Sequence, residues 1–251
     1  MALQTLTLIV IVGPSADGLR VTLDGIAATV TQVPYQVLVA GNGTALDQSV
    51  LAGLPFTATI VQSPAQVAPG AFLNAVLAHA KGDVVSFLPA GVRPEPWWTV
   101  GVFELLERAD VGAVAPRIVD ESGEQIVGTG IVAFDGVLVP RLAGLARDAM
   151  GALEPSALFF APSTGLSVKR EAFDRIGVFD AGFERTLFDL DWTLRARTSA
   201  LAIVYRPDVT MRSDRPIGIG PAAHTTADAR RFLDRWQAAF GTALDAQRFV
   251  P

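Results

Sequence analysis

Asp189 and Asp191, two residues apart, are the carboxylates whose spacing most directly suggests chemistry. In extended backbone, residues two apart point to the same side and could hold one metal ion together. In a helix they do not share a face, so each carboxylate would act alone. A single carboxylate within about 3 Å of a hydroxyl can serve as a general base. An aspartate at a helix start is also an ordinary first-turn acid that offsets unpaired amides, and both interpretations of Asp189 stay open.

Arg93, Arg212 and Arg215 are the cations considered as ligands of phosphate groups. Guanidinium groups can neutralise and orient phosphates directly, which some enzymes use in place of a metal ion. The alternative is that all three arginines are solvated surface charges. The sequence leaves this choice open.

Gly41-Asn42-Gly43 follows a predicted strand and could open a turn that binds a dinucleotide. The rest of that pattern is missing. Leu46 stands at the third glycine position, and Val61 stands about 20 residues after Gly41, where an acidic residue would hold the ribose. We therefore expect no dinucleotide cofactor. Asn42-Gly43-Thr44 also matches a glycosylation acceptor, but we interpret it as a turn after a strand.

The amino-acid composition excludes several kinds of functional site and several classes of binding partner for this chain. Among 251 residues there is no cysteine, which excludes disulfides, zinc–thiolate sites and cysteine nucleophiles, and two histidines leave little for a metal centre. The net charge is −5, and charged residues of one sign do not form blocks along the sequence. Nothing in this pattern indicates binding to nucleic acids or to anionic membranes. No apolar run approaches the ~18 residues of a membrane helix, and no basic residue precedes Arg20 as in a secretory signal. We expect a cytoplasmic protein whose partners are small molecules or proteins.

The elements that must position these residues follow an α/β pattern. Half of the residues are hydrophobic, and short apolar runs alternate with longer Ala- and Leu-rich stretches, which favours a parallel sheet between helices. Strands are predicted at Thr7–Val12, Tyr35–Ala40, Thr57–Val61, Asp83–Leu88 and Val111–Ala115. Helices are predicted at Asp17–Thr31, Pro69–Lys81 and Pro94–Arg108, the last with Pro94 and Pro96 in its first turn and both Trp97 and Trp98 buried.

The second half of the chain changes character. Asp135-Gly136 between apolar runs predicts a hairpin over Ile131–Val139, so the sheet should be mixed. Residues Pro140 to Pro155 lack periodicity and are expected to be irregular. Phe232, Trp236 and Phe240 recur every fourth residue after Thr226, which predicts a helix that docks one aromatic face on the body.

Several segments taken together resemble family 2 glycosyltransferases in order and spacing. They cover nearly the whole chain: a strand ending near Val12, a strand running into Asn42-Gly43-Thr44, Asn74 in Phe72–Ala75, Ala80–Leu88, Pro94–Trp98, Val111–Pro116, Val168–Phe173, Ile176–Asp180, Asp189–Arg195, Tyr205–Pro207 and Phe232–Trp236. The resemblance implies the GT-A fold, an α/β architecture with a mixed, mostly parallel sheet and helices on both faces. We expect one domain over 1–251, with a nucleotide-binding-type half (1–116), an acceptor-type half (117–215) and a C-terminal helical appendage (216–251).

The resemblance also implies transfer of a sugar from a nucleotide diphosphate donor to an acceptor hydroxyl, with a divalent metal on the diphosphate. At the donor positions the sequence departs from the family. The Asp-x-Asp after the fourth strand is replaced by Pro89-Ala90-Gly91, the base-contacting aspartate by Gly41, and the stacking aromatic by Pro14 or a neighbour. Val12, Asn42 and Asn74 complete the donor-binding positions. We therefore expect no cofactor, because the Mg²⁺ or Mn²⁺ site is lost, and we assign no metal role to His224.

On the acceptor side the resemblance makes Asp189 the candidate general base, although the glutamate that precedes it in the family is missing. Asp191 and Gly165 are acceptor-side candidates, with a turn glycine as the alternative for Gly165. Two hypotheses result: a non-catalytic binding, assembly or regulatory module, or an active, metal-independent inverting glycosyltransferase. A nucleotide sugar or a glycan is the expected ligand, and Pro94–Trp98 or Pro140–Pro155 could contact a protein partner or a second copy.

Overall fold

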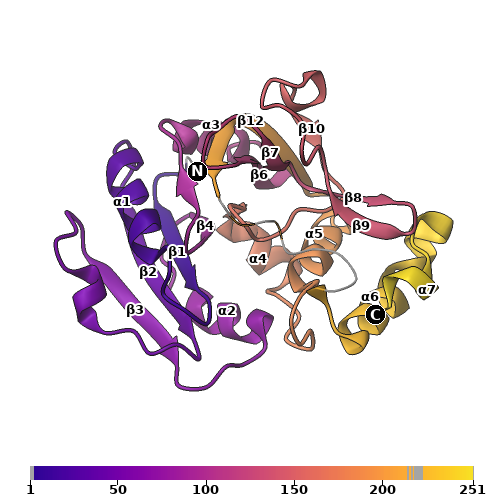
Figure 1. Cartoon of the computed structure of the whole chain (residues 1–251), viewed down its shortest axis with the longest axis horizontal. Helices are drawn as coiled ribbons and strands as arrows, with labels where there is room; N and C mark the ends of the chain where they lie inside the picture. The colour runs from indigo at the N-terminus through magenta and orange to yellow at the C-terminus, as the bar shows by residue number, and fades with distance from the viewer. Residues whose placement is uncertain (1–2, 214, 216, 218–222, 251) are drawn as a thin grey trace.

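One large sheet forms the centre of the molecule. The structure, a computed structural model, describes residues 3–213, 215, 217 and 223–250. Within them, ten strands form a mixed sheet in the order β10-β12-β6-β11-β4-β1-β2-β3, with β5 on β12 and β7 on β6 (Figure 1). The strands are β1 (Leu6–Val12), β2 (Tyr35–Asn42), β3 (Ala58–Ser63), β4 (Val84–Pro89), β5 (Arg93–Pro94), β6 (Val111–Val119), β7 (Ile126–Gly128), β10 (Ser156–Ala157), β11 (Ser167–Lys169) and β12 (Ala202–Arg212).

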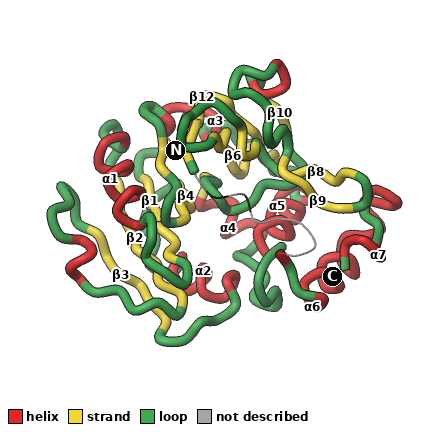
Figure 2. Tube along the Cα trace, in the orientation of Figure 1, coloured by secondary structure: helices red, strands yellow, loops and turns green. Residues whose placement is uncertain are grey.

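Helices flank this sheet, which confirms the predicted α/β class (Figure 2). They are α1 (Leu19–Thr29), α2 (Pro69–Leu77), α3 (Trp98–Leu106), α4 (Arg170–Ile176), α5 (Phe188–Thr198), α6 (Thr226–Phe240) and α7 (Ala246–Phe249), with short 3₁₀ turns at Gln48–Leu51, Met150–Ala152 and Gly241–Ala243. Helix α5 contacts both α2 and α4, whereas α1 contacts β1 and β5, and α3 contacts β6 and β12. In the described residues no helix combines the length and apolar character needed to cross a bilayer.

The neighbouring strands β4, β1, β2 and β3 run parallel, so their carboxyl ends lie along the same edge of the sheet. Strand β1 runs parallel to β2 and to β4, and β12 runs parallel to β6. Strand β11 is antiparallel to both β4 and β6 and joins the two parallel groups. Helices on both sides bury the central strands, which explains why β1 reads as a continuous apolar run rather than an alternating one.

The C-terminal helix α6 docks as its aromatic spacing predicts. Phe232 is fully buried and Trp236 is 9% exposed, while Phe240 stacks on Phe160. Helices α6 and α7 lie beside a separate hairpin, β8 (Ile131–Phe134) and β9 (Val137–Pro140) (Figure 1). Of the appendage predicted over 216–251, residues 216, 218–222 and 251 lie outside the described residues.

The predicted hairpin is confirmed. Strands β8 and β9 pair antiparallel around Asp135 and Gly136, whose φ angles of 48° and 80° are those of a tight turn with two left-handed residues. The following segment is predicted to be irregular from Pro140, but Pro140 is the last residue of β9. From there to Pro155 the chain holds turns, a short 3₁₀ helix and an isolated bridge at Ala146, so it is irregular as expected.

The prediction for the start of α3 is wrong. Pro94 lies in β5, antiparallel to β12, and the helix begins at Trp98, so neither Pro94 nor Pro96 is in its first turn. A proline disfavours helical backbone in the residue before it, so two prolines one residue apart keep this segment extended. Trp97 then turns into the helix with a φ of 70° and stays 67% exposed, whereas Trp98 is fully buried.

Candidate functional site

The carboxyl ends of the parallel strands bring three predicted donor-binding positions to one edge. Val12 at the end of β1 pairs with Gly41 of β2, and Ile11 pairs with Pro89 of β4. Open α/β sheets bind ligands at this kind of edge, outside the carboxyl ends of their strands. Val12 is buried, whereas Pro14, two residues on, is exposed.

At Gly41 the space for a side chain is already filled. A Cβ at this position would lie 2.8 Å from the Thr44 carbonyl oxygen and 3.0 Å from Leu46 Cδ1. Leu46 is buried, and its amide donates to Gln62 Oε1 over 2.9 Å, which fixes the chain around it. An aspartate at position 41 would therefore displace packed atoms.

Directly after β4 the backbone folds against α1. The Ala90 amide donates to the Ile11 carbonyl, and the Gly91 amide donates to the Gly18 carbonyl over 3.1 Å and to Thr22 Oγ1 over 2.9 Å. Gly91 has a φ of 99°, in the region that side chains disfavour. A Cβ on Gly18 would stand 2.7 Å from Gly91 Cα, so the two backbones touch.

The two asparagines among the donor-binding positions connect segments of the fold. The Asn42 side-chain amide donates to the Val67 carbonyl over 2.8 Å and accepts from the Val67 amide over 2.9 Å. In the same way, the Asn74 amide pairs with the backbone of Phe179, at 2.8 and 3.1 Å. Asn42 therefore joins the end of β2 to the loop before α2, and Asn74 joins α2 to the loop before α5.

Asp189 lies in the first turn of α5 and faces the chain before β11. Its Oδ2 accepts from the Ser163 amide over 2.6 Å, and its Oδ1 accepts from the Leu190 amide over 2.9 Å. Burial raises the pKa of this carboxyl above its ordinary value, against the opposing effect of the Ser163 and Leu190 hydrogen bonds. The residue as a whole is partly exposed, and its predicted role as a general base stays a prediction.

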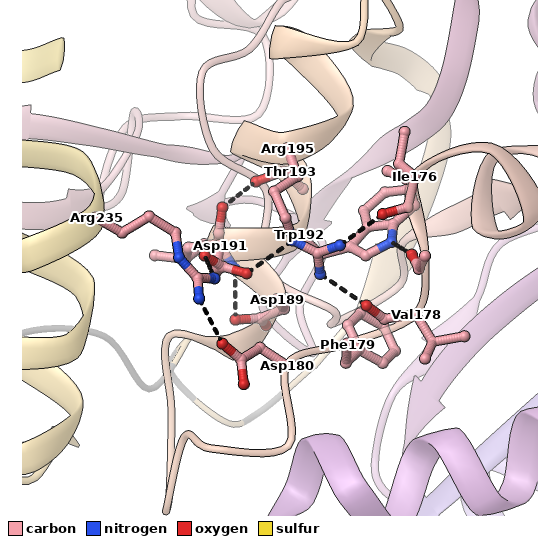
Figure 3. A network of polar contacts seen from close by, with 12 residues as sticks. Ile176, Val178, Phe179, Asp180, Asp189, Asp191, Trp192, Thr193, Arg195 and Arg235 are labelled. Atoms are coloured by element: carbon pink, nitrogen blue, oxygen red, sulfur yellow. Dashed lines mark hydrogen bonds and ion pairs between the residues drawn. The ribbon is translucent and has the colours of Figure 1, made fainter.

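Asp191 points in another direction, as expected for two residues that are two apart in a helix (Figure 3). It is fully buried and accepts from Arg195 Nε over 2.9 Å, Arg235 Nη1 over 2.6 Å and Trp236 Nε1 over 2.9 Å. Arg235 also bonds Asp180 over 2.9 Å. These contacts join α5 to α6, and Asp189 and Asp191 do not converge on one ion.

Gly165 occupies a tight turn between strands. Its φ is 73°, and its amide donates to the Phe87 carbonyl over 2.8 Å. A Cβ here would lie 2.6 Å from Pro116 Cγ and 2.7 Å from Met211 Sδ, because Gly165 packs between β6 and β12. Only glycine fits this position without a shift of its neighbours.

The three arginines considered for phosphate binding lie in two places. Arg93 Nη2 pairs with Glu121 Oε2 over 3.0 Å, and Arg212 Nε pairs with Glu95 Oε1 over 3.0 Å. Arg215 lies apart from these pairs and donates to the Asp17 carbonyl, in the loop between β1 and α1, over 3.1 Å.

Three polar residues of this neighbourhood, Glu95, Arg117 and Arg147, were not predicted as site residues. Glu95 binds Arg147 through two hydrogen bonds of 2.7 and 3.1 Å. Arg117 is 8% exposed and lies in β6. It is the one charged residue in that strand. A charged residue inside an otherwise uncharged strand is the sequence signal that would have found it.

Solved structures of other proteins share the fold of this chain. No known family profile matches the chain, and no curated protein matches it in sequence. Among solved structures, GalNAc-T7 with UDP, GalNAc and Mn²⁺ aligns with a TM-score of 0.69 and 15% identity over 93% of this chain. The mannosyltransferase PcManGT from Pyrobaculum calidifontis, in complex with GDP-Man and Mn²⁺, aligns with a TM-score of 0.64 and 17% identity over 97% of it.

These two structures are glycosyltransferases, and the chain shares their GT-A-like fold, as the resemblance in sequence implies. The chain spans 48% of the GalNAc-T7 chain and 69% of the PcManGT chain. Identities of this size show the fold alone.

Proposed function

We propose that this chain is a non-catalytic module that retains the glycosyltransferase fold and serves in binding, assembly or regulation. The observation that carries the proposal is the backbone at Gly91, where a φ of 99° favours a residue without a side chain. The Gly91 amide is fixed by hydrogen bonds to the Gly18 carbonyl and Thr22 Oγ1. This is the second position of the Asp-x-Asp that the resemblance implies. The packed space at Gly41, the base-contacting position, supports the same proposal.

The last residue of β4, Pro89, and the two residues after it do not fit a metal-bound diphosphate. Pro89, Ala90 and Gly91 supply no carboxylate, and hydrogen bonds to β1 and α1 occupy the amides of Ala90 and Gly91. The proposed function therefore includes no metal-assisted sugar transfer at these residues. Two charges in close contact are worth about 4 kcal/mol at an effective dielectric of about 20. Each 1.4 kcal/mol or so changes a rate tenfold, so losing this neutralisation would slow metal-dependent transfer by several orders of magnitude.

A second candidate function is metal-independent inverting transfer from a nucleotide sugar, and the environment of Asp189 favours it. A carboxylate with a raised pKa is a stronger base, and each carboxylate oxygen can accept more than one hydrogen bond. Asp189 would accept the proton of an acceptor hydroxyl as its oxygen attacks the anomeric carbon and the nucleotide diphosphate departs. On this hypothesis Asp189→Asn abolishes transfer, whereas a chelator does not; turnover that survives the substitution would contradict the role.

Calorimetry with nucleotides separates the two functions. UDP, GDP, dTDP and one nucleotide sugar of each are titrated with Mn²⁺ or Mg²⁺ present and then with a chelator. We expect no heat of binding at millimolar nucleotide from a well-folded sample, which would direct the search to protein or glycan partners. Tight binding without metal would favour the transferase, and metal-stimulated turnover of a nucleotide sugar would contradict the non-catalytic proposal.

A further inference from the structure

A groove of about 580 Å³ opens between α1, β5 and the irregular segment before β10, and we call it the arginine groove. Its floor and walls combine small residues of α1 with charged residues of distant segments. Gly25, Ala28 and Thr29 come from α1, and the remaining lining residues are Arg93, Pro94, Glu95, Pro96, Arg147 and Arg212. None of the donor-binding positions lines this groove.

Two carboxylates connect the guanidinium groups of the groove. Glu95 accepts from Arg147 Nη2 over 2.7 Å and from Arg212 Nε over 3.0 Å, so it lies between them. Arg212 also donates to the Glu121 carbonyl over 2.9 Å, and the Glu121 carboxylate pairs with Arg93. Glu95 is the less exposed partner in both of its pairs, at 18% against 35% for Arg147 and 30% for Arg212. Both arginines therefore remain accessible from the groove.

A fourth guanidinium, that of Arg117, lies against this network and donates to neutral acceptors. Its Nε and Nη2 donate to Thr210 Oγ1 over 3.2 and 3.0 Å, and its Nη1 donates to the Arg147 carbonyl over 3.2 Å. All of these acceptors are neutral, and among the described residues no ion pair joins Arg117 to a carboxylate. Burial lowers the pKa of this guanidinium, and the charges of Glu95 and Asp208 act in the opposite direction.

Two guanidiniums of the groove share one carboxylate. Arg147 and Arg212 both pair with Glu95, whereas Arg93 pairs with Glu121. At longer range, Glu124 acts on Arg147. In addition, Arg93 Nε is buried and has no partner. One carboxylate cannot neutralise two guanidiniums, and an oxyanion in the groove would supply a second negative charge and further acceptors.

We propose that the arginine groove binds a phosphate oxyanion, held by Arg147 and Arg212, with Glu95 displaced from at least one of them. Guanidinium groups bind phosphate through two parallel hydrogen bonds, the same geometry that Arg147 now presents to Glu95. Glu95 occupies the groove as an internal competitor of the anion. The inference does not depend on the proposed function.

Calorimetric titration with inorganic phosphate tests the proposal, with sodium chloride at matched ionic strength as the blank. We expect binding by the unmodified chain, at least tenfold weaker binding by Arg147→Gln and by Arg212→Gln, and tighter binding by Glu95→Gln. Arg108→Gln is the matched control, because Arg108 is an exposed arginine that pairs with Asp110 elsewhere, and it should bind as the unmodified chain does.

A network that only joins β5 and the irregular segment to the sheet predicts a different result. In that case no variant changes phosphate affinity, and Glu95→Gln lowers the melting temperature without any gain in binding. If a variant fails to fold, the unmodified chain still decides, since the absence of phosphate and pyrophosphate binding at millimolar concentration would overturn the proposal.

Pyrophosphate, UDP and a sugar monophosphate then identify the source of the phosphate. Tighter binding of pyrophosphate and UDP than of inorganic phosphate assigns a diphosphate, and equal binding of the sugar phosphate assigns a monoester. Loss of UDP binding in Arg147→Gln places the nucleotide in the arginine groove. If UDP still binds to Arg147→Gln, the nucleotide site lies outside the arginine groove, and that result tests the proposed function. Binding of inorganic phosphate remains the test of the groove itself.

Discussion

Gly91 stands where the resemblance implies the second carboxylate of the Asp-x-Asp, and its backbone conformation favours glycine. A side chain at a φ of 99° is disfavoured, so we expect Gly91→Ala to lower the free energy of unfolding by about 1–2 kcal/mol. Gly13 is the matched control, because a Cβ there would meet no atom within 4 Å, and Gly13→Ala should change stability little. Urea denaturation measures both, and equal effects would remove the argument that the loop after β4 requires glycine.

Asp189 makes a second prediction at the scale of the single residue. Its pKa is higher in the folded chain than its ordinary value of 3.8, so the folded state holds the proton more tightly than the unfolded state does. Its contribution to stability is therefore largest below pH 3.8 and is lost as the pH rises through the folded pKa. We expect Asp189→Asn to become more stable relative to the unmodified chain as the pH rises from acidic to neutral.

Asp83 is the control with the opposite sign. Hydrogen bonds from the Gln4 amide and from Thr5, together with Arg170, outweigh burial and lower the pKa of its carboxyl. Its contribution is present above the ordinary pKa and is lost as the pH falls, so Asp83→Asn should destabilise the chain more at neutral pH than in acid. Urea denaturation at several pH values measures both variants, and parallel pH trends would contradict the assignment of Asp189.

At the scale of the elements, α6 is held by buried carboxylates as well as by its aromatic face. Asp228 is 1% exposed and accepts from the amides of Glu184, Arg185 and Thr186, at 2.6, 3.0 and 3.2 Å. It also belongs to the capping box of the helix with Thr225. This one side chain therefore both starts α6 and orders the loop before α5.

The double role of Asp228 gives the third prediction. Thr225→Ala removes only the cap and should cost about 1 kcal/mol. Asp228→Ala also leaves three amides without their acceptor, so we expect a loss of about 3 kcal/mol. The free energies of unfolding of the two variants are compared directly, and equal losses would mean that Asp228 acts as a cap alone.

How far the sequence could predict the molecule depends on the range of each interaction. The apolar strands, the hairpin at Asp135-Gly136 and the aromatic face of α6 are local patterns, and the structure confirms them. The carboxyl ends of neighbouring parallel strands converge by geometry, so Val12, Gly41 and Pro89 lie at one edge of the sheet. The partners of Glu95, in contrast, are 52 and 117 residues away, at Arg147 and Arg212, and no local pattern indicates such pairs.

At the scale of the whole molecule, Trp97 reports whether the surface at the start of α3 is free or covered. Of the four tryptophans, Trp97 is 67% exposed, whereas Trp98, Trp192 and Trp236 are 0%, 0% and 9% exposed. Val100, one turn further along α3, is 50% exposed beside it. The prediction that Pro94–Trp98 contacts a protein partner or a second copy can therefore be tested at Trp97.

Iodide, which quenches only accessible indoles, tests this surface. In a dilute solution of the chain we expect iodide to quench the fluorescence of one tryptophan, and we expect Trp97→Phe to remove this accessible fraction. If copies associate through the start of α3, the accessible fraction falls as protein concentration rises, and Val100→Asp restores it because a buried charge opposes association. Glu104→Gln is the control, because Glu104 is an exposed residue of the same helix that pairs with Arg206. A concentration-independent accessible fraction would mean that copies of the chain do not cover this surface.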